Sequence, residues 1–285
     1  MKRIPLLVLI TFCLGFASCN MIHSEKNTAS AAPVTTEMNV KGEEPEIDGD
    51  FNTRSIQLID SVQFFGDDLD EWIDTDMSYF YADFQMPVTA NAALKDSIER
   101  FIKCSGERHF DENMEIGDGM PLLQALRDEY RKTTIVGETH YEEAKMEELT
   151  DRYVTYSSET RYSNYGAPRD YFVLTYATFH KDSGKKFGWN MFKNQDEFLE
   201  LMRSTLLNAC DLDVTGWDGE DFYAYDGPGY KFAKPGSMKP SDINIWISND
   251  KVEVKYNGNE FDPDIKFTYD DIKDLLTEDG QNFFE

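Results

Sequence analysis

The chain offers few residues in patterns that could carry catalysis. His109, His140 and His180 lie in the part with the composition of a folded protein, and Glu138 stands two residues before His140. A Glu-x-His pair on one side of a strand could ligate a metal ion, but a surface histidine beside an acidic helix is favoured in a chain with 54 acidic residues. The motifs H-E-x-x-H, C-x-x-C and G-x-S-x-G do not occur. We therefore expect no catalytic activity. A carboxylate pair for glycoside hydrolysis is left as an alternative, but the sequence does not identify its two members among 54 acidic residues.

One acidic segment has the spacing of a calcium-binding loop. Its oxygen donors are Asp211, Asp213, Thr215 and Asp218. Gly216 stands at the sixth position, where such loops turn sharply, but the twelfth position holds Phe222 in place of the usual bidentate Glu. Calcium is therefore a minor hypothesis beside an ordinary acidic turn, and no other cofactor is indicated.

A segment rich in aromatic residues and glycine, residues 222–230, could form a binding loop. Exposed rings of Tyr225 and Tyr230 could stack on sugars or anchor a protein partner. The competing interpretation is that the segment contributes a sheet residue or two and a turn, because strands naturally concentrate aromatic side chains.

The first nineteen residues have the layout of a bacterial lipoprotein signal. Lys2 and Arg3 precede a short apolar run, residues 4–16, and small residues lead into Cys19. A membrane span needs about twenty apolar residues, so the run indicates a cleaved export signal. We expect cleavage after residue 18, lipid on Cys19, and an extracytoplasmic protein anchored to the outer or the cytoplasmic membrane.

Two cysteines remain in the rest of the chain, Cys104 and Cys210. An oxidising compartment permits a disulfide between them, and two separate thiols are equally consistent with the spacing. The sequence does not decide between the two.

Charge and composition set broad limits on the partners. The 285 residues carry a formal net charge of −26 and are 40% apolar. Such a field repels nucleic acid and anionic lipid surfaces and favours cationic partners or metal ions, although a need for high solubility alone would also explain the acidic charge.

Residues 19–50 hold few aromatic residues and end in an acidic run, which predicts a flexible linker. From residue 51 onward the composition is that of a folded protein.

Periodicity and capping patterns predict an α+β fold with antiparallel, hairpin-built sheets and a few packed helices. Helices are expected at residues 91–104, with Asn91 as N-cap, and at 122–130, 142–149, 197–210 and 270–276. Strands are expected at residues 80–86, 154–156, 171–180, 243–247, 252–256 and 265–269. We expect two sequential subdomains, residues 51–168 and 169–285.

Several of these segments, taken in order, resemble the RsiV/PdaC-type family of extracytoplasmic domains. The matching segments are residues 153–156, 182–192, 222–223, 243–256 and 265–276, and residues 80–102 are similar to the smaller domain that precedes the family domain. Members occur outside the membrane in a lysozyme-sensing anti-sigma factor and beside the catalytic domain of a peptidoglycan deacetylase. The family's Gly-Gly-Ala-His stretch is reduced here to Gly166-Ala167. The resemblance implies a binding or sensing module for lysozyme or peptidoglycan.

We therefore expect a lipid-anchored extracytoplasmic binding protein without catalysis of its own, whose partner is a lysozyme-like cationic protein or peptidoglycan. The first alternative is an enzyme, or an enzyme accessory, that acts on cell-wall glycan; a concave site with His140 or His180 beside buried carboxylates would favour it. The second is a structural component of the cell envelope, which large exposed aromatic patches would favour.

Overall fold

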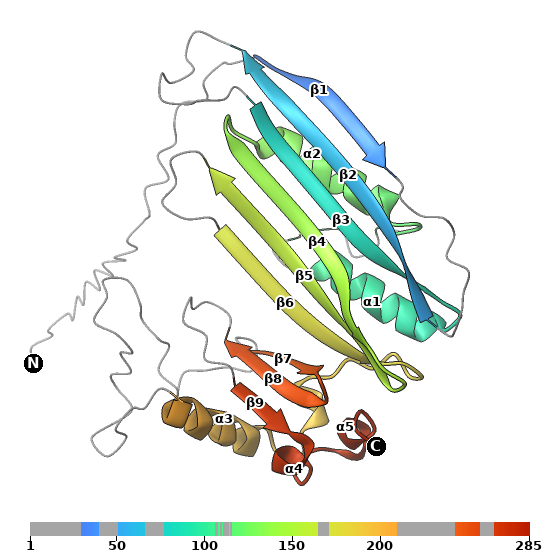
Figure 1. The fold of residues 1–285 in the computed structure, drawn as a ribbon, viewed down its shortest axis with the longest axis vertical. Coiled ribbons are helices and arrows are strands. Elements are labelled where there is room, and N and C mark those ends of the chain that lie inside the picture. The colour runs from blue at the N-terminus through green and yellow to red at the C-terminus, as the bar shows by residue number, and fades with distance from the viewer. Residues whose placement is uncertain are drawn as a thin grey trace, which may run out of the picture.

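The computed structural model describes residues 30–39, 51–65, 77–105, 108, 110, 114, 116–164, 171–209, 243–256 and 265–285, which contain two sheets (Figure 1). The larger sheet consists of β1 (Ser30–Asn39), β2 (Phe51–Phe65), β3 (Met77–Thr89), β4 (Glu138–Leu149), β5 (Tyr153–Asn164) and β6 (Tyr171–His180), in that order. The smaller sheet consists of β7 (Ile243–Ser248), β8 (Lys251–Tyr256) and β9 (Ile265–Thr268). The expected α+β class is confirmed.

Neighbouring strands are antiparallel except β3 and β4, which are parallel. Parallel neighbours need a long crossover, and the connection here carries α1 (Ala92–Cys104) and α2 (Met120–Thr133). Both helices were predicted. The Asn91 side chain accepts a hydrogen bond from the backbone N–H of Leu94, which confirms the predicted N-cap.

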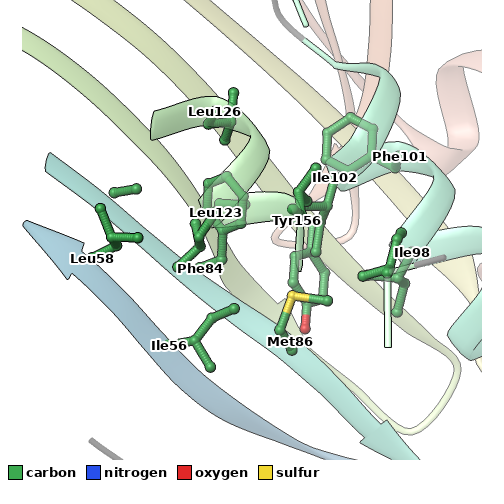
Figure 2. Packing of buried hydrophobic residues seen from close by; sticks show 14 of the residues in the cluster. Ile56, Leu58, Phe84, Met86, Ile98, Phe101, Ile102, Leu123, Leu126 and Tyr156 are labelled. Carbon is green, nitrogen blue, oxygen red and sulfur yellow. The ribbon is translucent and has the colours of Figure 1, made fainter. Parts of the chain in front are cut away.

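The two helices bury their apolar stripes against one face of the larger sheet. Figure 2 shows residues from both helices packed over β2 and β3: Ile98, Phe101, Ile102, Leu123 and Leu126 over Ile56, Leu58, Phe84 and Met86. Even-numbered residues of β3 point into this core, whereas its odd-numbered residues point to the opposite face. The two helices therefore cover only the face of the larger sheet to which the even-numbered residues of β3 point.

The smaller sheet has its own core. It packs with the 3-10 turn η1 (Trp189–Met191), α3 (Gln195–Ala209), α4 (Tyr269–Ile272) and α5 (Glu278–Gln281). The predicted hairpin is confirmed, and its turn residues Asn249 and Asp250 have φ of 52° and 56°, as a two-residue type I′ turn requires. Thr268 forms a capping box with Asp271 at the start of α4, where the Asp271 carboxylate accepts hydrogen bonds from the Thr268 N–H and hydroxyl.

Side chains of β7 connect the two sheets along β6. The Asn244 carboxamide accepts a hydrogen bond from the Tyr176 N–H at 2.9 Å and donates one to the Tyr176 carbonyl at 2.8 Å. Two residues further along β6, the Thr178 hydroxyl accepts a hydrogen bond from the Ile247 N–H at 2.8 Å. Trp246 stacks on the Tyr176 ring with 4.5 Å between ring centroids. The smaller sheet is therefore held against the last strand of the larger one.

Residues 142–149, predicted as a helix, form most of β4, so this prediction is wrong. Glu, Lys and Met are good helix formers, which explains the expectation. Tertiary contacts override this propensity, because Glu142 and Ala144 are buried on the helix-covered face while Glu143, between them, faces the other way. Pairing with β3 and β5 on both sides then satisfies the backbone of β4.

Two other boundaries differ from the expected ones. Residues 30–39 belong to the segment expected to be a flexible linker, but they form β1 and pair antiparallel with β2. Backbone hydrogen bonding to a sheet edge needs no apolar side chains, so composition does not reveal such a strand. The expected boundary between the two subdomains, at residues 168 and 169, falls between β5 and β6. These two strands pair along their length, so the larger sheet continues past this boundary to His180.

Candidate functional site

The face of the larger sheet opposite α1 and α2 contacts β7 at Thr155 and Thr178, and the rest of this face includes exposed side chains in the described part of the chain; we call that remaining part the open face. Its exposed apolar residues include Ile59, Tyr79, Tyr141 and Phe172. Single exposed apolar side chains are common on protein surfaces, but neighbouring ones form a patch of the kind that binds partners. The strand registers decide which of these side chains are neighbours.

One line of side chains on the open face runs across five strands, and we call it the aromatic rung. It consists of Ile59, Tyr81, Tyr141, Arg161 and Phe172, each paired in register with the next. The Tyr81 and Tyr141 rings stack with 5.0 Å between centroids and 14° between planes. The Arg161 guanidinium carbon lies 4.7 Å from the centroid of the Tyr141 ring, within the range of a cation–π contact.

The adjacent line of side chains is acidic, and we call it the acid rung. Asp83 of β3 lies opposite Glu143 of β4, which lies opposite Glu159 of β5. Like charges directly opposite each other destabilise a sheet. Partial compensation comes from Lys145, whose ammonium lies 3.1 Å from Glu143, and from Arg161, which lies 3.6 Å from Glu159.

The Asp83 carboxylate is held in place by its neighbours on β2. It accepts hydrogen bonds from the Ser55 hydroxyl at 2.7 Å and the Gln57 amide at 2.5 Å. The two rungs together line a shallow hollow of about 260 Å³. Burial, assisted by the neighbouring Tyr141 and Tyr79 hydroxyls, raises the pKa of Tyr81, so its phenol stays protonated and can donate a hydrogen bond.

The ring geometry limits what the open face can bind. Tyr81 stacks on Tyr141 and also on Tyr79, at 6.3 Å between centroids, and Arg161 covers Tyr141. The ring faces therefore contact one another, and a ligand meets mainly ring edges, hydroxyls and carboxylates. Carboxylates beside tyrosines suit the ammonium or guanidinium groups of a partner, whereas sugar stacking needs free ring faces.

His140 belongs to a buried polar cluster on the other face of the sheet. Its Nε2 lies 2.9 Å from a Glu142 oxygen, and the ring contacts Phe80, Tyr130 and Tyr162. The prediction of a surface histidine beside an acidic helix is therefore wrong, because the segment is a strand whose even-numbered residues face inward.

Arg108 neutralises Glu142 inside this cluster. The Arg108 and Glu142 side chains are 1% and 3% exposed, and a guanidinium nitrogen lies 2.6 Å from the carboxylate. Arg108 also donates to the Ile102 carbonyl, and the Thr160 hydroxyl donates to Glu142. Burial by itself would raise the pKa of Glu142, but Arg108 and His140 more than offset it and hold that pKa below its ordinary value.

This cluster has the features of a structural ion pair. Its donors and acceptors are paired with one another, and Arg108 lies 4.8 Å from the centroid of the Phe84 ring in the core. Glu138 does not join His140, since its carboxylate accepts a hydrogen bond from the Ile135 N–H. Among the described residues, no group of three His, Cys, Asp or Glu side chains is arranged to hold a metal ion.

His180 also has structural contacts. Its Nδ1 accepts hydrogen bonds from the backbone N–H groups of Asp182 and Ser183, and its ring packs edge-on against Phe283. Neither histidine lies beside the acid rung, so the structure does not bring the sequence candidates together into one site.

The remaining sequence candidates fall mostly outside the described residues. Cys104, the last residue of α1, is exposed, and Cys210 lies outside the described residues, so the choice between a disulfide and two separate thiols is not tested. Several other candidates also lie outside the described residues: Cys19 for lipidation, Asp211, Asp213, Thr215 and Asp218 for calcium, Tyr225 and Tyr230 for a partner, and His109. None of the helices in the described segments is both long and apolar enough to cross a membrane.

Sequence reasoning missed the open face, although a signal for it exists. Tyrosine or charged residues alternate with apolar ones along residues 79–84 and 143–146, which is the period of a strand with one face in solvent. The helix predicted at residues 142–149 concealed this alternation in β4. Without that strand, the two rungs cannot be assembled.

No family model matches the chain, and no curated protein matches it in sequence. Two similar solved structures are a member of the DUF3298 family from Bacteroides fragilis NCTC 9343 and a DUF3298 family protein from Pseudomonas aeruginosa PAO1. The first has a TM-score of 0.53 and 13% identity, over 82% of this chain and 96% of that chain. The second has a TM-score of 0.50 and 12% identity, over 90% of this chain and 97% of that chain. RsiV/PdaC-type domains belong to the DUF3298 family, so the resemblance is supported at the level of the fold. At these identities the likeness concerns the fold alone: the chain has the α+β fold of two DUF3298 family structures.

Proposed function

We propose that this protein is a lipid-anchored extracytoplasmic binding module for a basic, lysozyme-like protein or for peptidoglycan, without catalysis of its own. The observation that carries the proposal is the acid rung. Asp83, Glu143 and Glu159 stand side by side on an exposed sheet face, where their mutual repulsion costs stability. A cationic partner would relieve that repulsion when it binds.

The overall charge supports a basic partner. A net charge of −26 creates a field that accelerates encounters with basic proteins and repels anionic surfaces. Steering alone is not specific, because any basic protein experiences it. Specific recognition requires local complementarity, which the hollow between the acid rung and the aromatic rung can supply through hydrogen bonds to arginine or lysine side chains.

Between the two ligand classes, the ring geometry favours the basic protein. Glycan binding usually places a sugar on a free aromatic face. Here the Tyr141 ring has Tyr81 on one neighbouring strand and Arg161 on the other. Peptidoglycan remains the alternative ligand, and it would have to bind through hydrogen bonds to the carboxylates and tyrosine hydroxyls.

Biolayer interferometry at about 150 mM salt tests the proposal, because the Debye length there is about 8 Å and long-range attraction is weak. Immobilised protein is exposed to lysozyme and, as a basic control, to cytochrome c. Micromolar or tighter binding to lysozyme alone supports a specific module. Equal binding to both proteins, or to neither, contradicts the basic-protein assignment, and sedimentation with insoluble peptidoglycan then tests the glycan.

Two substitutions locate the binding surface. The double variant Glu143→Gln/Glu159→Gln removes two charges from the acid rung, and we expect about tenfold weaker binding or more. The matched control is Glu129→Gln, an exposed glutamate on α2 whose described ion pair is with Lys132. If the control weakens binding as much as the double variant does, net charge rather than the open face governs recognition.

The anchor is tested separately in cells that export the protein. Substitution Cys19→Ala removes the sulfur that would carry lipid. We expect the unchanged chain to incorporate labelled fatty acid and to sediment with membranes, and the variant to do neither. Membrane association of the variant at the level of the unchanged chain would contradict lipidation at this residue.

A further inference from the structure

The edge strand β1 has a fixed place and direction in the larger sheet. It begins at Ser30, opposite Phe65 at the end of β2, and it ends at Asn39, opposite Gln57. Figure 1 shows the start of β1 beside the arrowhead of β2. The chain therefore enters the larger sheet at the end where β2 leaves it, and we call this the Ser30 end.

The smaller sheet is attached at the other end, where β2 begins at Phe51, and we call this the Phe51 end. The strand pairings place the turn between β4 and β5 there. At this turn, the Glu148 carboxylate accepts a hydrogen bond from the Asn249 N–H at 2.9 Å, and Arg152 donates one to the Phe284 carbonyl at 2.7 Å. The 15 residues of β2 separate the two ends by about 46 Å.

The position of β1 limits the distance between the sheet and the membrane. This limit rests on the lipid anchor proposed at Cys19. Eleven residue steps separate Cys19 from Ser30, and a chain spans at most about 3.6 Å per residue, so Ser30 lies within about 40 Å of the anchor. If the sheet stood upright with its Phe51 end on the membrane, Ser30 would lie beyond that limit.

Unpairing of β1 would remove this restriction. The chain would then enter the larger sheet at Phe51, 32 residue steps after Cys19, and the limit would rise to about 115 Å. The attachment would also move from the Ser30 end to the Phe51 end. Pairing of β1 with β2 therefore shortens the reach of the anchored protein and selects the end of the sheet that is attached.

We propose that the pairing of β1 with β2 orients the anchored protein, with the Ser30 end toward the membrane and the smaller sheet away from it. The acidic charge acts in the same direction, because a protein of net charge −26 is repelled by anionic lipid and its body stays off the surface. A soluble partner then meets the open face and the smaller sheet from the side away from the lipid.

Energy transfer on liposomes tests this orientation. The chain from residue 19 onward, with Cys104→Ser and Cys210→Ser, is coupled through the Cys19 thiol to a maleimide lipid in phosphatidylcholine liposomes. These headgroups carry no net charge, so repulsion does not orient the protein. The coupling does not need lipidation in cells, which distinguishes a wrong orientation from a wrong assignment of the anchor.

Two exposed positions at opposite ends of the sheet carry the donor fluorophore, and headgroup-labelled lipid is the acceptor. Ile135, whose carbonyl accepts a hydrogen bond from the Ser78 hydroxyl, lies at the Ser30 end, and Asp182, in the turn after β6, lies at the Phe51 end. An azide-bearing amino acid at either position takes the fluorophore. We expect transfer from residue 135 to be at least about twofold more efficient, because about 46 Å separates the two ends. Equal transfer, or stronger transfer from residue 182, would overturn the proposal.

A pair of prolines tests whether β1 causes the orientation. Successive N–H groups of a strand point to opposite edges, so Thr36→Pro/Glu37→Pro removes one N–H that faces β2. Hydrogen exchange should show protected amides in residues 30–39 of the unchanged chain, loss of that protection in the variant, and no change in β3. The ratio of the two transfer efficiencies should then fall to about one. Unprotected amides in residues 30–39 of the unchanged chain, or an unchanged ratio in the variant, would each contradict a role of β1.

Discussion

The carboxamide of Asn244 pairs with both backbone groups of Tyr176, as the next strand of a sheet would. A single side chain thus continues the hydrogen bonding of β6 at the position where β7 approaches it. Beside it, Trp246 stacks on the Tyr176 ring, so polar and apolar contacts occur at one point. This contact matters for stability because it holds β7 of the smaller sheet against β6 of the larger sheet.

Substitution Asn244→Ala should destabilise the protein by about 2 kcal/mol. It leaves the N–H and the carbonyl of Tyr176 without partners in a half-buried position, and an unsatisfied buried group costs about 1–3 kcal/mol. Urea denaturation followed by tryptophan fluorescence measures the change. Asn190→Ala is the matched control, because Asn190 is exposed in η1. Equal effects of the two substitutions would show that the pairing with Tyr176 contributes nothing.

Substitution Glu142→Gln should cost about 3 kcal/mol or more at pH 7, because it leaves the Arg108 charge buried without its counter-ion. The loss should shrink at low pH. The folded pKa of Glu142 lies below its unfolded value of about 4.3, so the carboxylate stabilises the fold above that pH and loses this contribution as the pH falls through the folded pKa.

We compare the free energy of unfolding of the Glu142→Gln variant with that of the unchanged protein, by urea titration at several pH values between about 7 and 3. The difference between the two free energies isolates the contribution of this one carboxylate from those of the many others. The variant's stability should fall less steeply with decreasing pH below the unfolded pKa. A constant difference between the two proteins over the whole range would contradict the assignment of this pH dependence to the buried ion pair.

Substitution Gly184→Ala should destabilise the turn after β6 by about 2 kcal/mol or more. Gly184 has φ of +66°, and an added Cβ would lie 2.6 Å from the backbone of Ala93 in α1. Gly117→Ala is the matched control: its φ is +57°, but its nearest neighbour would be a Pro121 side-chain atom at 3.9 Å. Thermal denaturation should therefore show a clearly larger decrease in Tm for Gly184→Ala. Equal decreases would mean that backbone conformation alone, and not the contact with α1, governs the cost.

Substitution Glu143→Gln should raise stability and weaken partner binding together. Glu143 lies between Asp83 and Glu159, and removing a like charge from directly opposite positions gains about 0.5 kcal/mol. The gain should decrease with added salt, because these groups are near the surface. Urea denaturation at low and high salt, combined with interferometry, tests both parts. A loss of stability would show that the ion pair with Lys145 outweighs the repulsion.

Local sequence signals predicted the elements whose stability is decided within a few residues. Asn91 marks a helix start because its side-chain oxygen accepts a hydrogen bond from the backbone N–H of Leu94. The hairpin of β7 and β8 follows from two alternating segments on either side of Asn249 and Asp250. These signals need no contact with distant parts of the chain, which is why they could be predicted.

β4 could not be predicted in this way. Its residues favour a helix locally, and only the pairing with β3 and β5 and the burial of Glu142 against Arg108 make it a strand. Arg108 lies 34 residues earlier in the chain, so no local pattern connects the two. Because β4 was predicted as a helix, the open face was not expected from the sequence.

The sequence by itself determined the acidic charge, the α+β class, most of the helix and strand positions, and the expectation of a lipid-carrying Cys19. Only the tertiary structure decided which alternating residues became neighbours. Asp83, Glu143 and Glu159 are spread over 77 positions of the chain, and strand register places them in one line. Register depends on the whole sheet and on the helices that cover its other face, because a shift of one residue would turn each side chain to the opposite face.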